Sequence, residues 1–472
     1  MSTSETPVAV QDTATGMPTV TKGRAVALVI ALILGVLSYQ LNASMLSPAL
    51  PEMAKSLGTS TSAISQVTSL FFLAGAIGGV ALSRWSDYIG RRQSLIVVLL
   101  ILAIGTVICI LAPNLPVLLI GRVLQGASSA AFQLSYVILA EALSAKVFGT
   151  ALGLITAVNG GVGGFDGYVG GLLSDNFGYR SIFIVILTFG VVALIAVFIV
   201  VPKTPHTAST GRMDWWGAAV LAIGLICLTY FVSTGSDAGW TAPLTLLYLA
   251  GTLAAAVAFW FVERRSRSPL IAIQHLRSRQ VWPLLATTLL TLSGIFAVIN
   301  FTVVLLSQNT KAGFGLDAAL SALLFLTPAA LIGVFSAPLS GWLAGRVGWI
   351  RILRIGLALS VIMLIVIAIV PTSFGIVLTA VAVLGVTYNG LALTTTNGLG
   401  VLLSPKDAPA ALPGLNGAAF GIGASLGIGI VAPFAGAGTI GGFTTALWIS
   451  VVISVLALAT SLLIRGRPGQ HV

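Results

Sequence analysis

Fourteen long apolar runs constrain this chain more than any other feature of its sequence. Each run holds about 20–28 residues, which is enough for one helical crossing of a bilayer at about 1.5 Å rise per residue. Only helices or closed barrels satisfy backbone polar groups in lipid, and these runs are too long for barrel strands. The predicted spans are about 24–48, 62–83, 93–112, 115–140, 149–173, 181–201, 214–234, 241–262, 282–306, 317–344, 350–370, 374–402, 410–435 and 441–464.

Composition supports a membrane protein with many crossings. Of the 472 residues, 57% are hydrophobic and 7% are charged, whereas soluble domains carry about 25% charged residues. The 23 Lys and Arg outnumber the 12 Asp and Glu. Because the basic residues follow the loops between the spans, we interpret this excess as membrane topology and expect no nucleic-acid partner.

The basic residues also predict the orientation. With the N-terminus inside, nineteen Lys and Arg fall on the inner side, and the outer side holds Lys55, Arg180 and Lys311. This bias predicts that both termini are cytoplasmic and that the protein spans the cell's inner (plasma) membrane. Residues 1–21 form a predicted disordered cytoplasmic tail without the order of a cleaved signal peptide.

Two loops share a sequence frame, which indicates an internal repeat. Residues Ser83–Arg92 follow the second span, and Gly341–Gly348 follow the tenth span. The thirteenth span also resembles the fifth in its glycine density, which gives an offset of eight spans. We therefore predict two parallel six-helix halves, with a substrate site between them near the bilayer midplane.

The predicted domains follow from this repeat. Residues 22–202 form the N-terminal six-helix bundle, 203–281 form two linker helices and a cytoplasmic loop, 282–465 form the C-terminal bundle and 466–472 form a tail. The basic part of the linker, about 263–281, is consistent with a segment lying along the membrane surface or with a solvated connection.

The fifth span contains an acid among glycines. Asp166 lies within the glycine-rich stretch Asn159–Gly171, and a carboxylate in hydrocarbon is costly, so it is a functional candidate. The alternative is an acid that is satisfied by its neighbours and serves structure. The glycines allow close helix packing.

Three polar side chains are predicted at one depth. Arg122 and Asp166 lie about 10 Å, and Asn42 about 9 Å, from the outer ends of their spans. Arg122 is always protonated and needs a partner, so we hypothesise an Arg122–Asp166 pair. Its separation would let Asp166 take up a proton, and its re-formation would expel that proton. The alternative is a permanent ion pair that locks two helices.

The fourth span carries a polar stripe. Arg122, Gln125, Ser129 and Gln133 recur at helical spacing, so they are predicted to face the cavity rather than lipid. The further substrate-cavity candidates are Gln40, Asn42, Ser44, Asn159, Asn300, Asn389 and Asn397. Instead of lining the cavity, each of these side chains could form an interhelical hydrogen bond.

Four motifs together resemble the major facilitator superfamily, in particular its fourteen-helix drug:proton antiporter branch. Ser83–Arg92 is similar to that family's cytoplasmic loop motif, Arg122–Gly126 to its fourth-helix motif, Leu41–Pro51 to the branch's first-helix signature, and Met213–Gly217 to the opening of its seventh helix. Two positions depart from the branch. Asn42 replaces the first-helix aspartate, and Asp166-Gly167 replaces Gly-Pro in the fifth-helix antiporter motif.

The resemblance implies an all-α integral membrane protein with the major facilitator fold, built of two six-helix bundles plus two extra transmembrane helices. It implies a cytoplasmic gate, with positive-inside topology as the alternative role of the arginines. The gate residues would be Asp87, Gly90, Arg91 and Arg92, and Glu141 is placed to join them.

The predicted function is a secondary active exporter that exchanges inward protons for a lipophilic small molecule, such as a drug or antibiotic. The alternatives are an exporter of a sugar, amino acid or other metabolite and, more remotely, a non-transporting membrane sensor or scaffold. The sequence holds no constellation typical of an enzyme, a metal site or a cofactor site, so none is expected. We expect a monomer whose partners are its substrate, protons and the lipid bilayer.

Overall fold

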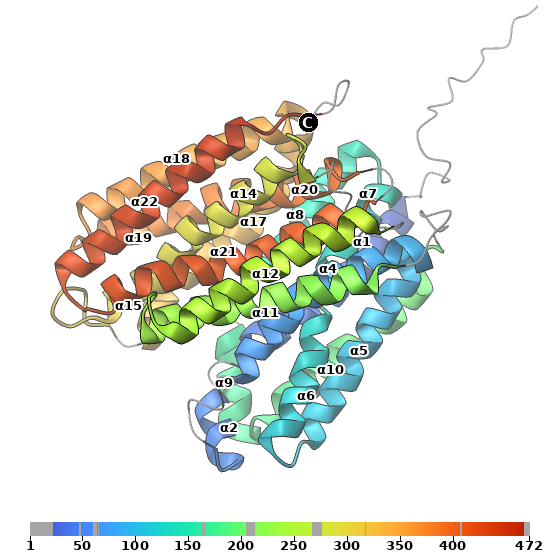
Figure 1. Cartoon of the computed structure of the whole chain (residues 1–472), viewed down its shortest axis with the longest axis horizontal. Helices are drawn as coiled ribbons and strands as arrows, with labels where there is room; N and C mark the ends of the chain where they lie inside the picture. The colour runs from blue at the N-terminus through green and yellow to red at the C-terminus, as the bar shows by residue number, and fades with distance from the viewer. Residues whose placement is uncertain are drawn as a thin grey trace, which may run out of the picture.

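The structure, a computed structural model, describes residues 22–46, 49–59, 64, 66–161, 166–203, 213–266, 276–316, 318–405 and 408–466. Within these ranges, thirteen helices are long and apolar enough to cross a membrane. They form two groups with a helix pair between them in sequence (Figure 1). The all-helical membrane fold predicted from the sequence is confirmed.

Before residue 203, the described residues form nine helices, which make up the first group. They are α1 (Lys22–Ser44), α2 (Leu50–Ser56), α4 (Gln66–Ile89), α5 (Arg91–Leu111), α6 (Leu115–Ala127), α7 (Ala130–Ala142), α8 (Ala145–Gly161), α9 (Asp166–Phe177) and α10 (Arg180–Val200). The linker pair is α11 (Trp215–Ala238) and α12 (Pro243–Arg265).

In the part of the second group that the structure describes, four π-helical segments, η3 to η6, are inserted into the α-helices. Its elements are α14 (Trp282–Thr291), η3 (Leu292–Phe296), η4 (Val298–Thr302), α15 (Val303–Gln308), α16 (Ala318–Ser321), η5 (Ala322–Leu326), α17 (Thr327–Val347), α18 (Trp349–Ile369), α19 (Phe374–Leu384), η6 (Gly385–Leu393), α20 (Thr394–Leu402), α21 (Ala411–Ala435) and α22 (Ile440–Leu462). Such π segments are rare and frequently mark functional sites.

The described residues of the fifth predicted span lie in α8 and α9, and residues 162–165 between them lie outside the described ranges. The fourth span is divided, because Ser128 and Ser129 form a turn between α6 and α7. Hydropathy predicts the length of an apolar run but does not reveal such a turn.

The repeated loops adopt the same backbone conformation. Gly90 precedes α5 with a φ of 92°, and Gly348 precedes α18 with a φ of 111°. This left-handed region is open to glycine and unfavourable for other residues. The glycine shared by the two loops therefore has a conformational cause.

The two groups meet at the end of the molecule that carries these loops, which we call the inner end. There α8 packs along α17. A Cβ added at Gly149 would lie 2.1 Å from the Gly341 carbonyl oxygen, and a Cβ added at Gly153 would lie 2.3 Å from the Ala337 carbonyl oxygen. Figure 1 shows the groups diverging toward the opposite end. The inner end is thus closed by backbone contact that glycine alone permits.

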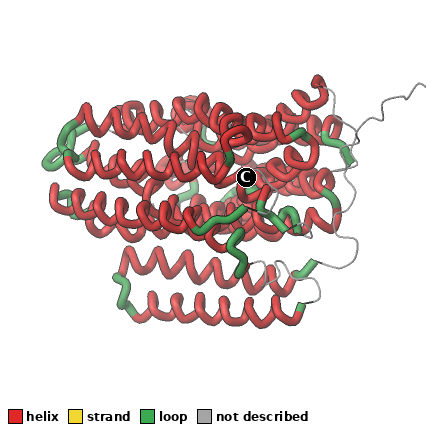
Figure 2. Tube along the Cα trace, turned by 90° about the horizontal axis from the view of Figure 1, so that it is seen from above, coloured by secondary structure: helices red, strands yellow, loops and turns green. Residues whose placement is uncertain are grey.

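The linker pair forms a layer of its own beside the two groups (Figure 2). Helix α11 packs against α12 and also contacts α4 of the first group and α21 of the second. The pair therefore lies over the seam between the groups.

We predict that Gly149→Ala opens the inner end. Its methyl group would overlap the Gly341 carbonyl, and overpacking costs about 1–3 kcal/mol, which shifts a two-state ratio about five- to 150-fold. Double electron–electron resonance between spin labels at the exposed positions Lys146 and Arg346 would report a longer label-to-label distance. Gly421→Ala is the control, because nothing lies within 4 Å of an added Cβ there. An unchanged distance distribution for Gly149→Ala would contradict this account of closure.

Candidate functional site

Arg122 lies on α6 with 1% of its surface exposed, and neutral groups surround it. Its Nη1 donates to the side-chain oxygens of Asn42 at 2.7 Å and Gln125 at 2.8 Å. Its Nε donates to the Val67 carbonyl at 2.9 Å and its Nη2 to the Asn42 carbonyl at 3.3 Å. The guanidinium also lies 4.2 Å from the centroid of the Phe71 ring. Carbonyl dipoles and a π face thus replace water around a permanent cation.

The predicted Arg122–Asp166 pair does not form in this structure. Asp166 begins α9 and is 3% exposed, and it accepts a hydrogen bond from the Ser44 hydroxyl, while no hydrogen bond reaches its Oδ1 atom. Asn42, which binds Arg122, and Ser44 are two residues apart on α1, so their side chains lie on roughly opposite sides of that helix. The pairing hypothesis was wrong for this conformation because α1 lies between the two charges.

Two further contacts hold α9 against α2 and the end of α1. An added Cβ at Gly170 would lie 2.1 Å from the Met45 carbonyl oxygen. The Ser174 hydroxyl donates to the carboxylate of Glu52, which is on α2. Together with the Asp166 contact, these hold α9 against α1 and α2 along its length. The sequence analysis did not single out Glu52, because its partner is distant in the chain.

The polar stripe of the fourth span is buried between helices. Gln125 is fully buried, and its Nε2 donates to the Thr106 hydroxyl at 2.9 Å. The Ser129 hydroxyl donates to the Gly75 carbonyl at 2.5 Å. Both side chains therefore make interhelical hydrogen bonds, whereas the sequence analysis predicted that the stripe faces the cavity.

Gln133, the last residue of the stripe, reaches the second group. A Cβ added at Gly79 of α4 would lie 3.7 Å from the Gln133 Nε2 atom. A Cβ added at Gly417 of α21 would lie 2.1 Å from the same atom. Two glycines from different groups thus make room for this amide. Its Oε1 atom is buried without a hydrogen-bond partner.

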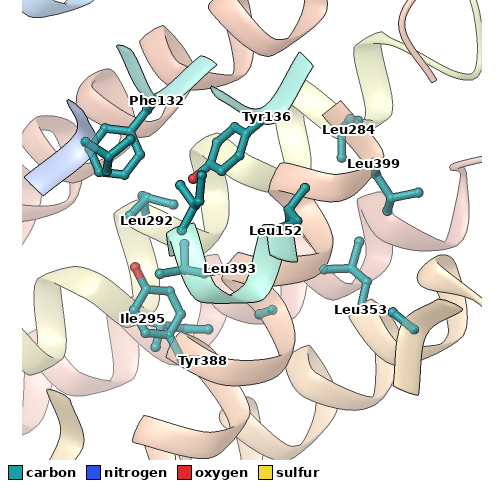
Figure 3. Packing of buried hydrophobic residues seen from close by; sticks show 14 of the residues in the cluster. Phe132, Tyr136, Leu152, Leu284, Leu292, Ile295, Leu353, Tyr388, Leu393 and Leu399 are labelled. Carbon is teal, nitrogen blue, oxygen red and sulfur yellow. The ribbon is translucent and has the colours of Figure 1, made fainter. Parts of the chain in front are cut away.

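Asn397 makes a second polar contact between the groups. From α20, its Nδ2 donates to the Tyr136 hydroxyl at 3.1 Å and the Thr156 hydroxyl at 3.4 Å. Tyr136 and Phe132 belong to one apolar cluster with Leu292 and Leu393 of the second group (Figure 3). The sequence analysis named Asn397 but missed its aromatic and hydroxyl partners.

The remaining cavity candidates occupy several environments. Gln40 is 8% exposed and lies one turn before Ser44, whose hydroxyl donates to the Gln40 carbonyl at 2.9 Å. Asn300 in η4 is exposed, and its Nδ2 donates to its own helix at Phe296. Asn389 in η6 is half-buried, and its Nδ2 donates to a carbonyl of α17 at 3.3 Å. The side chain of Asn159 lies outside the described part of the chain.

The predicted gate residues form a buried ionic network at the inner end. Asp87 is fully buried and accepts from Arg84 and from Arg91, each at 2.5 Å. The Nε atom of Arg91 donates to Glu141 of α7 at 3.0 Å. Arg92 points elsewhere and donates to the Phe198 carbonyl. The network joins α4, α5 and α7, and its gating role remains a prediction.

Two helical groups with a closed inner end, buried charges and a linker pair define a polytopic membrane protein of the secondary-transporter type. The profile of the Major Facilitator Superfamily matches residues 32–428. The chain therefore belongs to the Major Facilitator Superfamily, and it is a transporter of small molecules rather than an enzyme.

Relatives with assigned names fall into two groups. The chain is 39% identical over 415 residues to the uridine/deoxyuridine transporter of Lactococcus lactis subsp. cremoris (strain MG1363), covering 86% of each chain. It is 28% identical to the multidrug resistance protein Stp of Mycobacterium tuberculosis, covering 67% of this chain and 58% of that one. It is 26% identical to the tetracenomycin C resistance and export protein of Streptomyces glaucescens, covering 87% and 76%.

Solved structures of other transporters share the fold. The human organic anion transporter MFSD10 superposes with a TM-score of 0.66 at 16% identity, covering 93% of this chain and 99% of that one. The proton:xylose symporter XylE superposes with a TM-score of 0.64 at 14% identity, covering 93% and 95%. At these identities the likeness concerns the fold alone.

We predict that Arg122→Lys destabilises the protein. Lysine cannot reproduce the planar fork that binds Asn42, Gln125 and Val67 at once, and hydrogen bonds to a charged group contribute about 1.5–3 kcal/mol each. Fluorescence-detected size exclusion after heating would show an earlier loss of the monodisperse peak. Arg351→Lys, at an exposed position of α18, should behave as wild type. Equal stability of both variants would show that the Arg122 network is dispensable.

Proposed function

We propose that this protein is a proton-coupled transporter of a nucleoside-class solute, such as uridine or deoxyuridine, that works by alternating access. The observation that carries this proposal is the 39% identity to the Lactococcus uridine/deoxyuridine transporter, which extends over 86% of both chains. A nucleoside is a metabolite, so this proposal corresponds to the alternative from the sequence analysis rather than to drug export, its main prediction.

The side chains between the two groups support a neutral polar cargo. Gln133, Asn397 and Tyr136 all lie where the groups join, and they carry amides and a hydroxyl rather than charges. The guanidinium of Arg122 already donates hydrogen bonds to Asn42 and to its other neutral partners. Amides and hydroxyls recognise a solute through hydrogen bonds, and buried polar groups discriminate strongly against an analogue that leaves them unpaired.

We assign the proton-carrying role to Asp166. Its only described side-chain partner is the Ser44 hydroxyl, which can donate to a carboxylate and can accept from a protonated carboxyl. A change of protonation at Asp166 would therefore alter the contact between α9 and α1. Because α1 also holds Arg122 through Asn42, this helix is placed to pass the change to α6.

The proposal includes the direction and the topology expected from the sequence. The similarity to antiporter motifs favours export of the solute against inward protons. We propose that the protein lies in the inner (plasma) membrane with both termini cytoplasmic, acts as a monomer and uses residues 22–202 and 282–465 as its two moving bundles.

Export of a lipophilic drug is the second candidate. It is favoured by the relative named for tetracenomycin C resistance and export, which matches over 87% of this chain. The lower identity, 26% against 39%, places it behind nucleoside transport.

We predict that Asp166→Asn abolishes uridine transport driven by a proton gradient but leaves uridine counterflow, which needs no gradient. Reconstituted vesicles loaded with labelled uridine would measure both. The control is Asp214→Asn, because asparagine caps a helix about as well as the aspartate that caps α11. Gradient-driven transport by Asp166→Asn at the wild-type rate would remove Asp166 from the mechanism. If an acid on α1 can substitute for it, Asn42→Asp with Asp166→Asn should regain part of the coupling.

Substrate competition separates the two candidate functions. We expect labelled uridine to undergo counterflow in vesicles with the wild-type protein, and we expect unlabelled deoxyuridine to inhibit it more strongly than a panel of lipophilic drugs. Vesicles of opposite orientation give the direction. Absence of uridine counterflow, together with proton-driven extrusion of a drug, would overturn nucleoside transport in favour of drug export.

A further inference from the structure

A continuous apolar groove runs between the linker pair and the second group. Its deeper part, about 250 Å³, lies between α11, α14 and α21, and Leu225, Leu289 and Ile422 are among its exclusively apolar lining residues. A smaller cavity toward the inner end shares Leu221 and Leu415 with it. We call this combined space the linker groove.

Aromatic residues mark the level of the membrane surface beside the groove. Trp215 and Trp216 at the start of α11 are 55% and 80% exposed, and Trp282 at the start of α14 is 40% exposed. Exposed tryptophans at the ends of spanning helices are typical of the headgroup region. The groove therefore begins at the inner interface of the bilayer.

The groove extends through roughly one leaflet. Leu225 lies ten residues after Trp215 on α11, which corresponds to about 15 Å. Half of the hydrocarbon core of a bilayer is also about 15 Å thick. The length and the apolar lining together fit a hydrocarbon chain that lies parallel to the helices.

Three exposed basic residues lie close to the mouth of the groove. Leu276 lines the cavity at the inner end, and it is followed in sequence by the exposed Arg277 and Arg279. The backbone N–H of Arg465, also exposed, donates to the Arg279 carbonyl at 3.2 Å. None of these three arginines takes part in an ion pair within the described ranges.

We propose that the linker groove binds one acyl chain of an anionic glycerophospholipid, whose headgroup lies at Arg277, Arg279 and Arg465. Charge complementarity at the mouth selects an anionic lipid, and the apolar lining accepts its chain. A substrate molecule does not fit these features as well, because no polar side chain lines the deeper part.

The position of the groove gives such a lipid a role in transport. Helix α11 contacts both α4 and α21, and Arg84, which lines the inner cavity, is also bound to Asp87 of the gate network. A bound chain would fill the space over which the second group moves relative to the linker pair. Anionic lipid should therefore raise the transport rate as well as bind.

Native mass spectrometry of the purified protein with phosphatidylglycerol, and separately with phosphatidylcholine, tests the proposal. We expect one phosphatidylglycerol to be retained preferentially. Arg277→Gln with Arg279→Gln should weaken its retention about thirtyfold, since each arginine near an anionic surface contributes about fivefold. Leu225→Trp, which fills the groove, should prevent retention without changing the charge. The controls are Arg351→Gln on α18 and Leu339→Trp on α17, both at exposed positions away from the groove.

The same variants, confirmed as monodisperse, are assayed for uridine counterflow in vesicles with and without phosphatidylglycerol. Retention that is equal for both lipids, or that survives both the arginine and the tryptophan changes, would overturn the proposal. Displacement of the lipid by uridine or by a drug would also overturn it, because the groove would then be a substrate path. Because retention needs no transport, this test remains valid if the nucleoside proposal fails.

Discussion

The burial of one arginine in the membrane interior is the interaction on which the first group depends. Arg122 cannot lose its charge, and its guanidinium donates hydrogen bonds to oxygen acceptors from α1, α4 and α6. An isolated charge in hydrocarbon would be costly, so these three helices are obliged to pack around it. The asparagine at position 42 supplies both its side-chain and its backbone oxygen to that packing.

Because the partner of Arg122 is neutral, the fixed cation and the titratable acid can occupy separate places in the site. In the antiporter branch that the sequence resembles, an acid is expected at the position of Asn42, where it would lie against the arginine. In this protein carbonyl dipoles hold the arginine, and the carboxylate is Asp166 of α9, on the other side of α1. A fixed cation and a titratable acid can then act on one helix without neutralising each other. In the proposed mechanism, α1 is the element whose two arrangements the proton selects.

The second constraint is the closure of the inner end. Glycine contacts between α8 and α17 bring the backbones together, and Asn397 adds a hydrogen bond across the seam, while Gln133 packs against Gly417. The ionic network around Asp87 and Arg91 stiffens the first group beside this seam. These contacts must separate if the protein opens at this end, so they set the relative stability of the two conformations.

Much of the fold follows from the sequence, whereas the partners within the site do not. Apolar run length predicts the spans, and the frame shared by the two loops predicts the internal repeat, in which Gly90 and Gly348 adopt the same left-handed conformation. Counting residues gives the depth of Arg122 and Asp166 but not the side of α1 on which each lies, so the pair predicted from depth does not form in this conformation. The Asn397–Tyr136 contact joins residues 261 positions apart, and the π segments change the hydrogen-bond register without changing hydropathy. Neither feature leaves a signal in one sequence.

The central claim is that Asp166 carries the proton while Arg122 stays bound to α1. Infrared difference spectroscopy of the reconstituted protein, recorded as uridine is added, tests it most directly. The account predicts a carboxylic-acid carbonyl band that changes on addition of uridine, is absent from Asp166→Asn and persists in Arg122→Lys. A band that remains unchanged in Asp166→Asn would contradict the account, because another group would then carry the proton.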